Sequence, residues 1–399
     1  MRIYLDHNAT SPLHPEVASL VSRLLTEEFG NPSSVHTFGQ RAKAVLDEAR
    51  SHVAALIGAE PGDVVFTSGG TEADNFAIRG AAEALEPTGR RHLIASSIEH
   101  EAVLTTIKAL EKRGWSATLL PVGQSGIVEP DALGAAMRDD TALVSVMHAN
   151  NEIGTIQPVR ELAAVAHARG ALFHTDAVQS VGKIPVSVRE LGVDLLSLAG
   201  HKFNGPKGTG ALWLKRGTRL TATMTGGRQE RNRRAGTENV PALAGLGLAC
   251  RIVGEKVVHL RSAAPSYGGQ PPTVEMALLR DRLESGVLAS VPDTAVNGAR
   301  DRRVPNTTNI SFEGIEAESL LIALDLEGVA VSTGSACSSG SLEPSHVIKA
   351  MGLPHHRGTS SIRFSFGLGN TGEEVDFVVA RLPALVEKLR ALTGRARRA

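Results

Sequence analysis

Cysteine is scarce in this chain of 399 residues, which contains only two. Two cysteines exclude a disulfide framework and a four-cysteine zinc ribbon. The histidine pairs lack metal-ligand spacing such as His-Glu-x-x-His. We therefore predict no metal site made by the ligands of this protein alone.

An excess of charge of one sign and long apolar runs are missing as well. The 42 Lys and Arg balance the 42 Asp and Glu, which argues against a chain held to nucleic acid by bulk electrostatics. No run approaches the ~18 uncharged apolar residues of a membrane helix, and the first residues, MRIYLDHNAT, lack a signal-peptide core. We predict a cytoplasmic protein that binds neither nucleic acid directly nor a membrane.

Short apolar runs alternate with segments of helical period in the first two thirds of the chain. Strands are predicted at 64–67, 92–96, 118–121, 142–147, 172–175, 193–198 and 210–214. Helices are predicted between them at 71–85, 101–112 and 159–168. Apolar strands separated by helices predict an α/β fold with a mostly parallel sheet covered on both faces.

The pattern changes from about residue 256 onward. Helices are predicted at 274–288, 316–326 and 373–392, and strands at 294–297, 307–312 and 361–365. We predict a large domain over residues 14–255 and a smaller α+β domain made of 1–13 and 256–399. A Gly, Pro and Ser-rich stretch at 262–272 is predicted to be a loop, and a Ser/Gly-rich loop at about 332–342 belongs to the smaller domain.

Polar residues that directly follow the predicted strands are the candidate ligand contacts, because ligands of parallel sheets bind at the carboxyl ends of the strands. Thr71 follows glycines that allow close approach of the backbone, and it either caps a helix or binds a phosphate oxygen. Asp176 either caps a short helix or faces a cation in the cleft. Lys202 is either a surface lysine on a turn or an amine nucleophile in a partly dry pocket. His100 is either a structural residue or a catalytic one.

The two cysteines differ in their surroundings. Cys250 lies in an apolar helical run and is interpreted as inert core. Cys337 lies in a segment of Ser, Gly and Ala, where it is either incidental or a working thiol.

Nine motifs follow one another along nearly the whole chain in an order that identifies a family. They are LDHNAT (5–10), SGGTEADN (68–75), EH (99–100), MHANNEIG (147–154), HTDAVQS (174–180), GHKFNGPKGTG (200–210), RRAGTEN (233–239), TGSACSSGSLEPSHV (333–347) and SSIRFSFG (360–367). The set strongly resembles the cysteine desulfurases of the NifS/IscS kind, in the branch with a long cysteine loop. These are class V aminotransferase relatives that depend on pyridoxal 5'-phosphate. The resemblance implies fold type I, with a seven-stranded sheet in the large domain and the mobile cysteine loop in the small one.

The resemblance also implies a role for individual residues. Lys202 bonds to the cofactor and moves the substrate α-proton, Cys337 receives the sulfur, and His100 stacks over the cofactor ring and moves a proton. Cofactor contacts are implied for Gly70, Thr71, His100, Asn151, Asp176, Gln179, Ala199, Gly200, His201, Lys202 and Thr237, the last from the neighbouring subunit of a homodimer. Asn151 and Arg363 are implied to bind the substrate. Ala199 departs from the family pattern, which often has a serine donor to the phosphate there.

The implied reaction takes sulfur from L-cysteine, leaving L-alanine and a persulfide on Cys337. The implied partners are an iron–sulfur scaffold protein or another sulfur acceptor. In a complex with the scaffold, Cys337 could be one ligand of a shared iron–sulfur cluster. Two alternatives stay open: an aminotransferase-like or selenocysteine-lyase-like enzyme, and a sulfur-relay or scaffold-binding protein with an inactive cofactor site.

Overall fold

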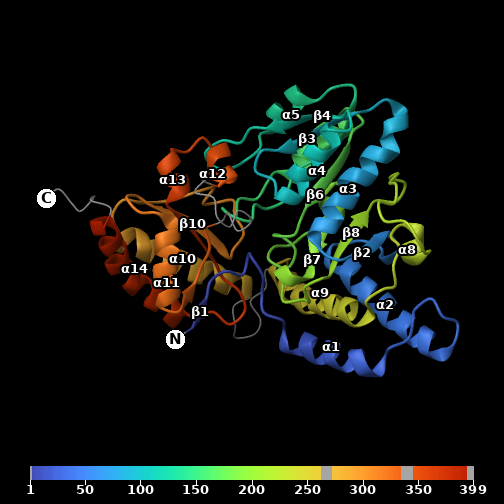
Figure 1. The fold of residues 1–399 in the computed structure, drawn as a ribbon, viewed down its shortest axis with the longest axis horizontal. Helices are drawn as coiled ribbons and strands as arrows, with labels where there is room; N and C mark the ends of the chain where they lie inside the picture. The colour runs from blue at the N-terminus through green and yellow to red at the C-terminus, as the bar shows by residue number, and fades with distance from the viewer. Residues whose placement is uncertain (1, 262–271, 334–344, 393–399) are drawn as a thin grey trace.

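A seven-stranded sheet forms the centre of the larger lobe in a computed structural model, which describes residues 2–261, 272–333 and 345–392 (Figure 1). Its strands are β2 Val64–Thr67, β3 His92–Ser96, β4 Ser116–Leu120, β5 Thr141–Ser145, β6 Leu172–Asp176, β7 Leu195–Ala199 and β8 Gly210–Leu214. The spatial order is β2-β8-β7-β6-β5-β3-β4, and only β8 runs antiparallel to its neighbours. The predicted fold class is confirmed.

Helices cover both faces of this sheet. One face packs on α1 Pro15–Glu27, α2 Thr37–Leu56, α5 Pro130–Ala136, α6 Val159–Ala168 and α9 Val240–Arg261. The other face packs on α3 Gly70–Leu85 and α4 Glu101–Glu111. Side chains alternate along a strand, so Val64 and Phe66 of β2 join the first core and Val65 joins the second. Burial on both faces explains why the strands are continuous apolar runs. The shorter helices α7 Val188–Leu191 and α8 Gln229–Asn232 lie in connecting segments.

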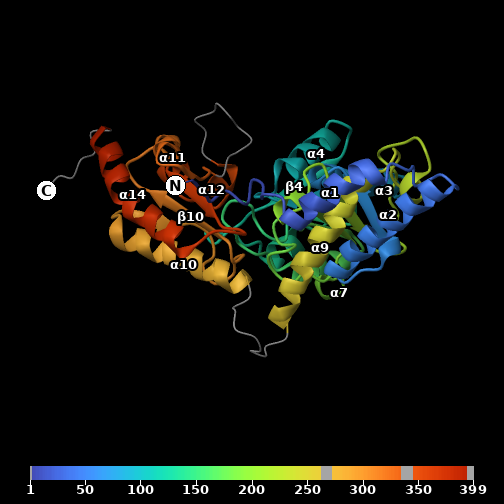
Figure 2. The same ribbon diagram turned by 90° about the horizontal axis from the view of Figure 1, so that it is seen from below.

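A second core lies in the smaller lobe, at the left of Figures 1 and 2. Its sheet has the order β12-β10-β9, and a two-stranded sheet pairs β1 with β11. These strands are β1 Ile3–Tyr4, β9 Thr294–Val296, β10 Thr307–Phe312, β11 Val329–Ala330 and β12 Ser361–Ser365. The helices packed on this core are α10 Pro272–Ser290, α11 Ala317–Leu326 and α14 Gly372–Leu392, and α13 His355–Thr359 lies beside β10. Helix α12 His346–Ala350 packs on the core of the larger lobe instead.

The amino-terminal segment belongs with the smaller lobe, since β1 pairs with β11 and Asp6 bridges to Ser365. Helix α9 continues to Arg261, and α10 begins at Pro272. The predicted loop at 262–272 therefore lies outside the described residues except for its last residue, which is helical. The domain limits 14–255 and 256–399 stay a prediction, which the two cores favour except at 347–353, where apolar residues pack on the core of the larger lobe. None of the described helices combines the length and apolar character needed to cross a membrane.

A buried ion pair fastens the segment before α9 to the edge of the large sheet. The Arg50 guanidinium donates to both carboxylate oxygens of Glu230 at 2.7 Å, and Phe66 N–H donates to the same carboxylate at 2.9 Å. Both side chains are under 9% exposed. Glu230, Arg231 and Asn232 all have positive φ, from 46° to 65°. Non-glycine residues adopt this conformation at a cost, which the contacts of Glu230 offset.

We expect Arg50→Met to lower the free energy of unfolding by about 3–5 kcal/mol, because the Glu230 charge stays buried without its partner. Urea unfolding measures this loss. Lys43→Met removes an exposed partner of Asp47 on the same helix and should cost less than about 1 kcal/mol. Equal losses in the two variants would contradict the assigned role of the Arg50–Glu230 pair.

Candidate active site

Six parallel strands end at one edge of the large sheet, and a candidate residue lies at or after the end of five of them. Gly70 comes after β2, His100 after β3, Asn151 after β5, Asp176 ends β6, and Lys202 comes after β7. The charges of His100 and Lys202 both act on Asp176, so these three side chains lie close together. This edge is the candidate site.

Asp176 is buried at the centre of the site. Its Oδ1 accepts a hydrogen bond from Val178 N–H at 2.8 Å, in a turn and not at a helix start. The helix-cap alternative is therefore wrong. Burial raises the pKa of Asp176, while His100, the Val178 N–H and Lys202 lower it. A buried carboxyl in this setting favours a cationic partner from a ligand.

Lys202 is partly buried on the 3-10 turn Gly200–Lys202 that follows β7. Its Nζ donates to the carbonyl oxygens of Asn8 at 2.7 Å and Ala9 at 2.9 Å. The alternative of a surface lysine is wrong. Gly200, buried at the start of the turn, would place an added Cβ 2.7 Å from Thr209 Oγ1, so only glycine fits there.

The first turn of α3 can receive an anion. Gly69 is its N-cap, with φ 153°, and no side chain of the described residues caps it. Thr71 is therefore not the cap, and its side chain is exposed. A Cβ added to Gly70 would lie 2.8 Å from the Val178 side chain and 3.6 Å from the Ala199 methyl group. Close-approaching backbone and a free helix start are features of phosphate sites, but Ala199 supplies no hydroxyl.

The two candidate histidines have distinct settings. His100 is the N-cap of α4, and its Nδ1 accepts from Ala102 N–H at 3.1 Å. Nδ1 of His100 therefore has a structural role, as one of the two predictions stated. A catalytic role of His100 would use Nε2. His201 Nδ1 lies 3.2 Å from Thr10 Oγ1. Burial and the Lys202 charge lower the pKa of His201 to about 4, so its ring is neutral near pH 7.

Arg363 brings a nearly buried guanidinium to the site from β12 of the smaller lobe. Its Nη2 donates to Asp6 at 2.6 Å and its Nη1 to the Asn151 carbonyl at 3.0 Å. Its Nε is buried without a hydrogen-bond partner among the described residues. An unsatisfied buried donor is costly, and a ligand carboxylate would satisfy it.

Asn8 connects most of these groups, although the sequence reasoning missed it. Its carbonyl accepts from Lys202 and from Gln179 Nε2, and its side chain accepts from Lys183 Nζ at 2.7 Å. Its Nδ2 donates to Asn151 O and to Thr307 Oγ1. Asn8 belongs to the motif LDHNAT at 5–10, but the partners of its side chain and carbonyl lie 143 to 299 residues further along the sequence.

The contacts described above do not include two of the predicted residues, Thr237 and Cys337. Thr237 is exposed between α8 and α9, and within the described residues it forms no hydrogen bond with another candidate. Cys337, with most of the predicted loop at 332–342, lies outside the described residues. The described contacts bring together Asn151, Gln179, Lys202 and Arg363, directly or through Asn8, and Asp176 lies close to His100 and Lys202.

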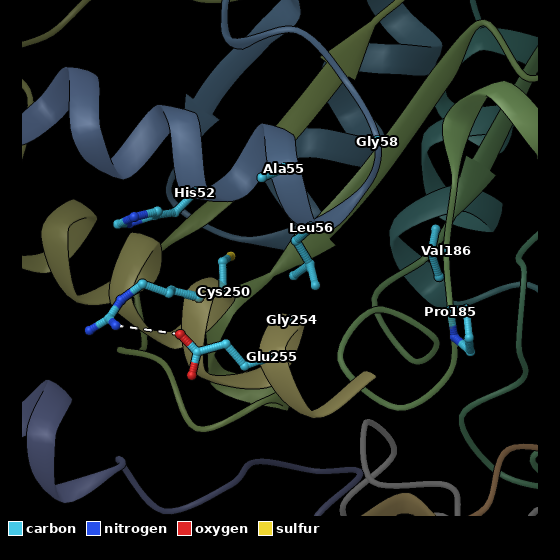
Figure 3. Close-up of a pocket in the computed structure, with 10 residues that line it drawn as sticks. His52, Ala55, Leu56, Gly58, Pro185, Val186, Cys250, Gly254 and Glu255 are labelled. Carbon is cyan, nitrogen blue, oxygen red and sulfur yellow. Dashed lines mark hydrogen bonds and ion pairs between the residues drawn. The ribbon is translucent and has the colours of Figure 1, made fainter. Parts of the chain in front are cut away.

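Cys250 lies elsewhere, against a separate cavity of about 250 Å³ between α2 and α9 (Figure 3). The cavity is lined by residues such as Leu56 and Val186, with the Arg251–Glu255 pair beside it. Cys250 is 1% exposed, and burial strongly raises the pKa of its thiol. The interpretation as core cysteine holds. Among the described residues no group of three or more His, Cys, Asp or Glu could hold a metal ion.

Comparison with known proteins identifies the family. The model of the aminotransferase class-V family matches residues 3–378. A cysteine desulfurase IscS of Dictyoglomus turgidum is 48% identical over 98% of this chain and 96% of its own, and one of Methanosarcina thermophila is 47% identical over 98% and 93%. A solved NifS-like protein superposes with a TM-score of 0.88 at 34% identity, over 98% of this chain and 100% of its own. The chain belongs to the class-V aminotransferase family, which has fold type I and uses pyridoxal 5'-phosphate.

The residues at the strand ends fit this cofactor. Asp176 offers a buried carboxyl to the pyridine nitrogen, and Lys202 offers an amine after the end of the neighbouring parallel strand β7. The start of α3 offers backbone N–H groups to the phosphate. Only glycine fits at position 70, because a Cβ there would lie 2.8 Å from the Val178 side chain. The residue roles themselves remain predictions.

Proposed function

We propose that the protein is a cysteine desulfurase that takes sulfur from L-cysteine and leaves L-alanine. The observation that carries this proposal is the convergence of a partly buried Lys202, a buried Asp176 and a buried guanidinium with a free Nε on one edge of the sheet. Those three groups suit an amino acid substrate bound beside pyridoxal phosphate. The relatives that are named cysteine desulfurases cover nearly the whole chain.

When bound, pyridoxal phosphate supplies an electron sink for the carbon that loses its proton. Asp176 keeps the pyridine nitrogen positively charged through its carboxylate. Arg363 orients the substrate by its carboxylate. The Lys202 amine takes and returns the proton at the substrate Cα, and His100 moves the thiol proton.

Sulfur transfer needs a thiolate close to the substrate sulfur. The C–S bond of cysteine breaks as an S–S bond forms to Cys337, so cysteine and one thiol give alanine and one persulfide without an external oxidant. The described residues on both sides of 334–344 contact the site. Ser332 pairs by backbone hydrogen bonds with Arg363, and His346 donates to the carbonyl of Glu99, the residue before His100. The described residues on either side of this segment thus lie at the candidate site.

The test of this function is the reaction of the purified holoenzyme with L-cysteine and a reductant. We expect alanine and sulfide to form in equal amounts over many turnovers. Bound cofactor without alanine formation would reject the desulfurase and leave the relay or scaffold-binding alternative. Release of pyruvate or of a transaminated product would favour another activity of the family.

Arg363→Lys is expected to raise KM for L-cysteine roughly 10- to 100-fold, because an ammonium cannot replace the fork of the guanidinium. Steady-state kinetics measure KM, and the absorbance of bound cofactor checks that loading is unchanged. The control, Arg381→Lys, changes an exposed arginine of α14 and should leave KM unaltered. An unchanged KM in Arg363→Lys would remove Arg363 from substrate binding.

We also propose a homodimer in which Thr237 reaches the phosphate of the neighbouring subunit. The exposure of Thr237 and the attachment of its segment through Glu230 support this role. The sulfur acceptor is proposed to be an iron–sulfur scaffold protein or another carrier, in which case Cys337 could share a cluster with the scaffold. A cytoplasmic location stays a prediction, and it agrees with the need for a reduced thiol at Cys337.

A further inference from the structure

The turn that leads into α3, residues 68–70, is fixed by close packing and by a carboxylate. A Cβ added to Gly210 of β8 would lie 2.7 Å from the carbonyl carbon of Gly69, so the two backbones are in direct contact. Ser68 N–H donates to the carboxylate of Glu72, one turn further along, at 2.8 Å. This bond resembles the return contact of a capping box. The turn therefore depends on a side chain that lies in the first turn of the same helix.

Glu72 also brings a negative charge to this helix start. Burial acts to raise the pKa of Glu72, but the hydrogen bonds from Arg234 and Ser68 and the charge of Arg234 outweigh it and hold the pKa below its ordinary value. The carboxylate is therefore ionised near pH 7. An unpaired charge of this sign would repel a phosphate bound at the start of α3.

Arg234 neutralises this carboxylate with a two-pronged hydrogen bond. Its Nε donates to one oxygen of Glu72 at 2.8 Å, and its Nη2 donates to the other at 3.1 Å. Both side chains are less than a quarter exposed, so solvent and salt screen the pair only in part. The charges of Glu230 and Glu238 also act on Arg234, and Glu230 is itself paired with Arg50.

The same arginine links the turn to the segment between α8 and α9. Arg234 stands three residues before Thr237, which is proposed to reach the phosphate of the neighbouring subunit. Elsewhere this segment is tied to the loop before β2, where Arg231 donates to the carbonyl of Gly62 at 2.7 Å. The Glu72–Arg234 pair thus connects two parts of the chain that are both predicted to contact a cofactor phosphate.

We propose that Glu72 and Arg234 form a positioning pair for the cofactor phosphate, in which Glu72 fixes the turn through Ser68 N–H and Arg234 cancels the charge of Glu72. The phosphate depends strongly on the backbone N–H groups of this turn, because Ala199 supplies no hydroxyl. The inference rests on the proposed position of the phosphate and does not require the desulfurase reaction.

The test compares the binding of pyridoxal phosphate with that of pyridoxal, which lacks the phosphate, to the full-length chain freed of cofactor. Absorbance titration gives Kd for each compound. In Arg234→Gln, Kd for pyridoxal phosphate should rise about tenfold while Kd for pyridoxal stays within about twofold of the wild type. Adding Glu72→Gln to this variant should bring Kd for pyridoxal phosphate back to within about threefold of the wild type, because the amide oxygen accepts from Ser68 N–H without a charge. Arg234→Lys keeps the positive charge and should also stay within about threefold.

Arg91→Gln is the matched control, since it removes the arginine of an ion pair with Glu86 at the other end of α3 and should change neither Kd. Equal rises of Kd for the two compounds in Arg234→Gln would overturn the proposal, as would a double variant that binds pyridoxal phosphate no better than Arg234→Gln. If Arg234→Gln binds neither compound, the double variant decides by the same comparison with the wild type. A wild type that binds both compounds equally well would overturn the phosphate position itself. None of these titrations uses turnover of cysteine, so failure of the proposed desulfurase activity would be seen separately, as absence of alanine.

Discussion

Lys202→Ala is expected to form alanine from L-cysteine at least about 10³-fold more slowly than the wild type. The variant loses both the amine that bonds to the cofactor and the base at the substrate Cα. The structure places no equivalent amine at this strand end, because the neighbouring His201 is neutral near pH 7 and Lys183 is held by two amide oxygens. The variant should still bind the cofactor, since Asp176 and the start of α3 are unchanged.

The covalent attachment gives a second readout. Sodium borohydride makes the bond between cofactor and lysine permanent in the wild type, and peptide mapping should find it on Lys202 alone. In Lys202→Ala the cofactor should wash off after the same treatment. Lys207→Ala is the control, because Lys207 is exposed on the same glycine-rich segment and should keep full activity and labelling. Attachment to Lys183 would contradict the assignment.

The elements of the large sheet could be predicted because their signals are local. An apolar run and the polar residue that ends it stand side by side in the sequence, as with Asp176 at the end of β6 and Lys202 after β7. The common edge at which these residues meet then follows from the parallel topology. Most cofactor candidates were found in this way or by resemblance.

The contacts that hold the site together could not be predicted. The Asn8–Lys183 bond joins residues 175 apart, and the Arg50–Glu230 pair joins residues 180 apart. Neither contact has a local sequence pattern, because an asparagine in a loop or an arginine on a helix can equally well be exposed on the surface. The cap role of His100 was likewise undecided, since either reading requires the position of the ring. The contact predicted for Thr237 requires a second subunit, so the contacts within one chain do not test it.

Cys337→Ala is expected to lower alanine formation from L-cysteine at least about 10²-fold and to abolish persulfide. The thiolate is the nucleophile in sulfur transfer, and the chain has only one other cysteine. Cys250 cannot replace it, because it is buried in the core of the larger lobe and burial strongly raises the pKa of its thiol. Mass spectrometry of alkylated peptides should find one added sulfur on the Cys337 peptide of the wild type after one turnover.

Cys250→Ala is the matched control for this experiment. It removes the other thiol, so it should lose some stability through the core but retain alanine formation and the persulfide on Cys337. Sulfur on Cys250, or alanine formation that survives Cys337→Ala, would show that the substrate C–S bond breaks without this thiol. A lyase would behave in that way, since it releases its product without a protein acceptor. Retained cofactor absorbance in Cys337→Ala would then distinguish a lost sulfur acceptor from a damaged cofactor site, because the residues proposed to hold the cofactor, Asp176 and Lys202, are unchanged in this variant.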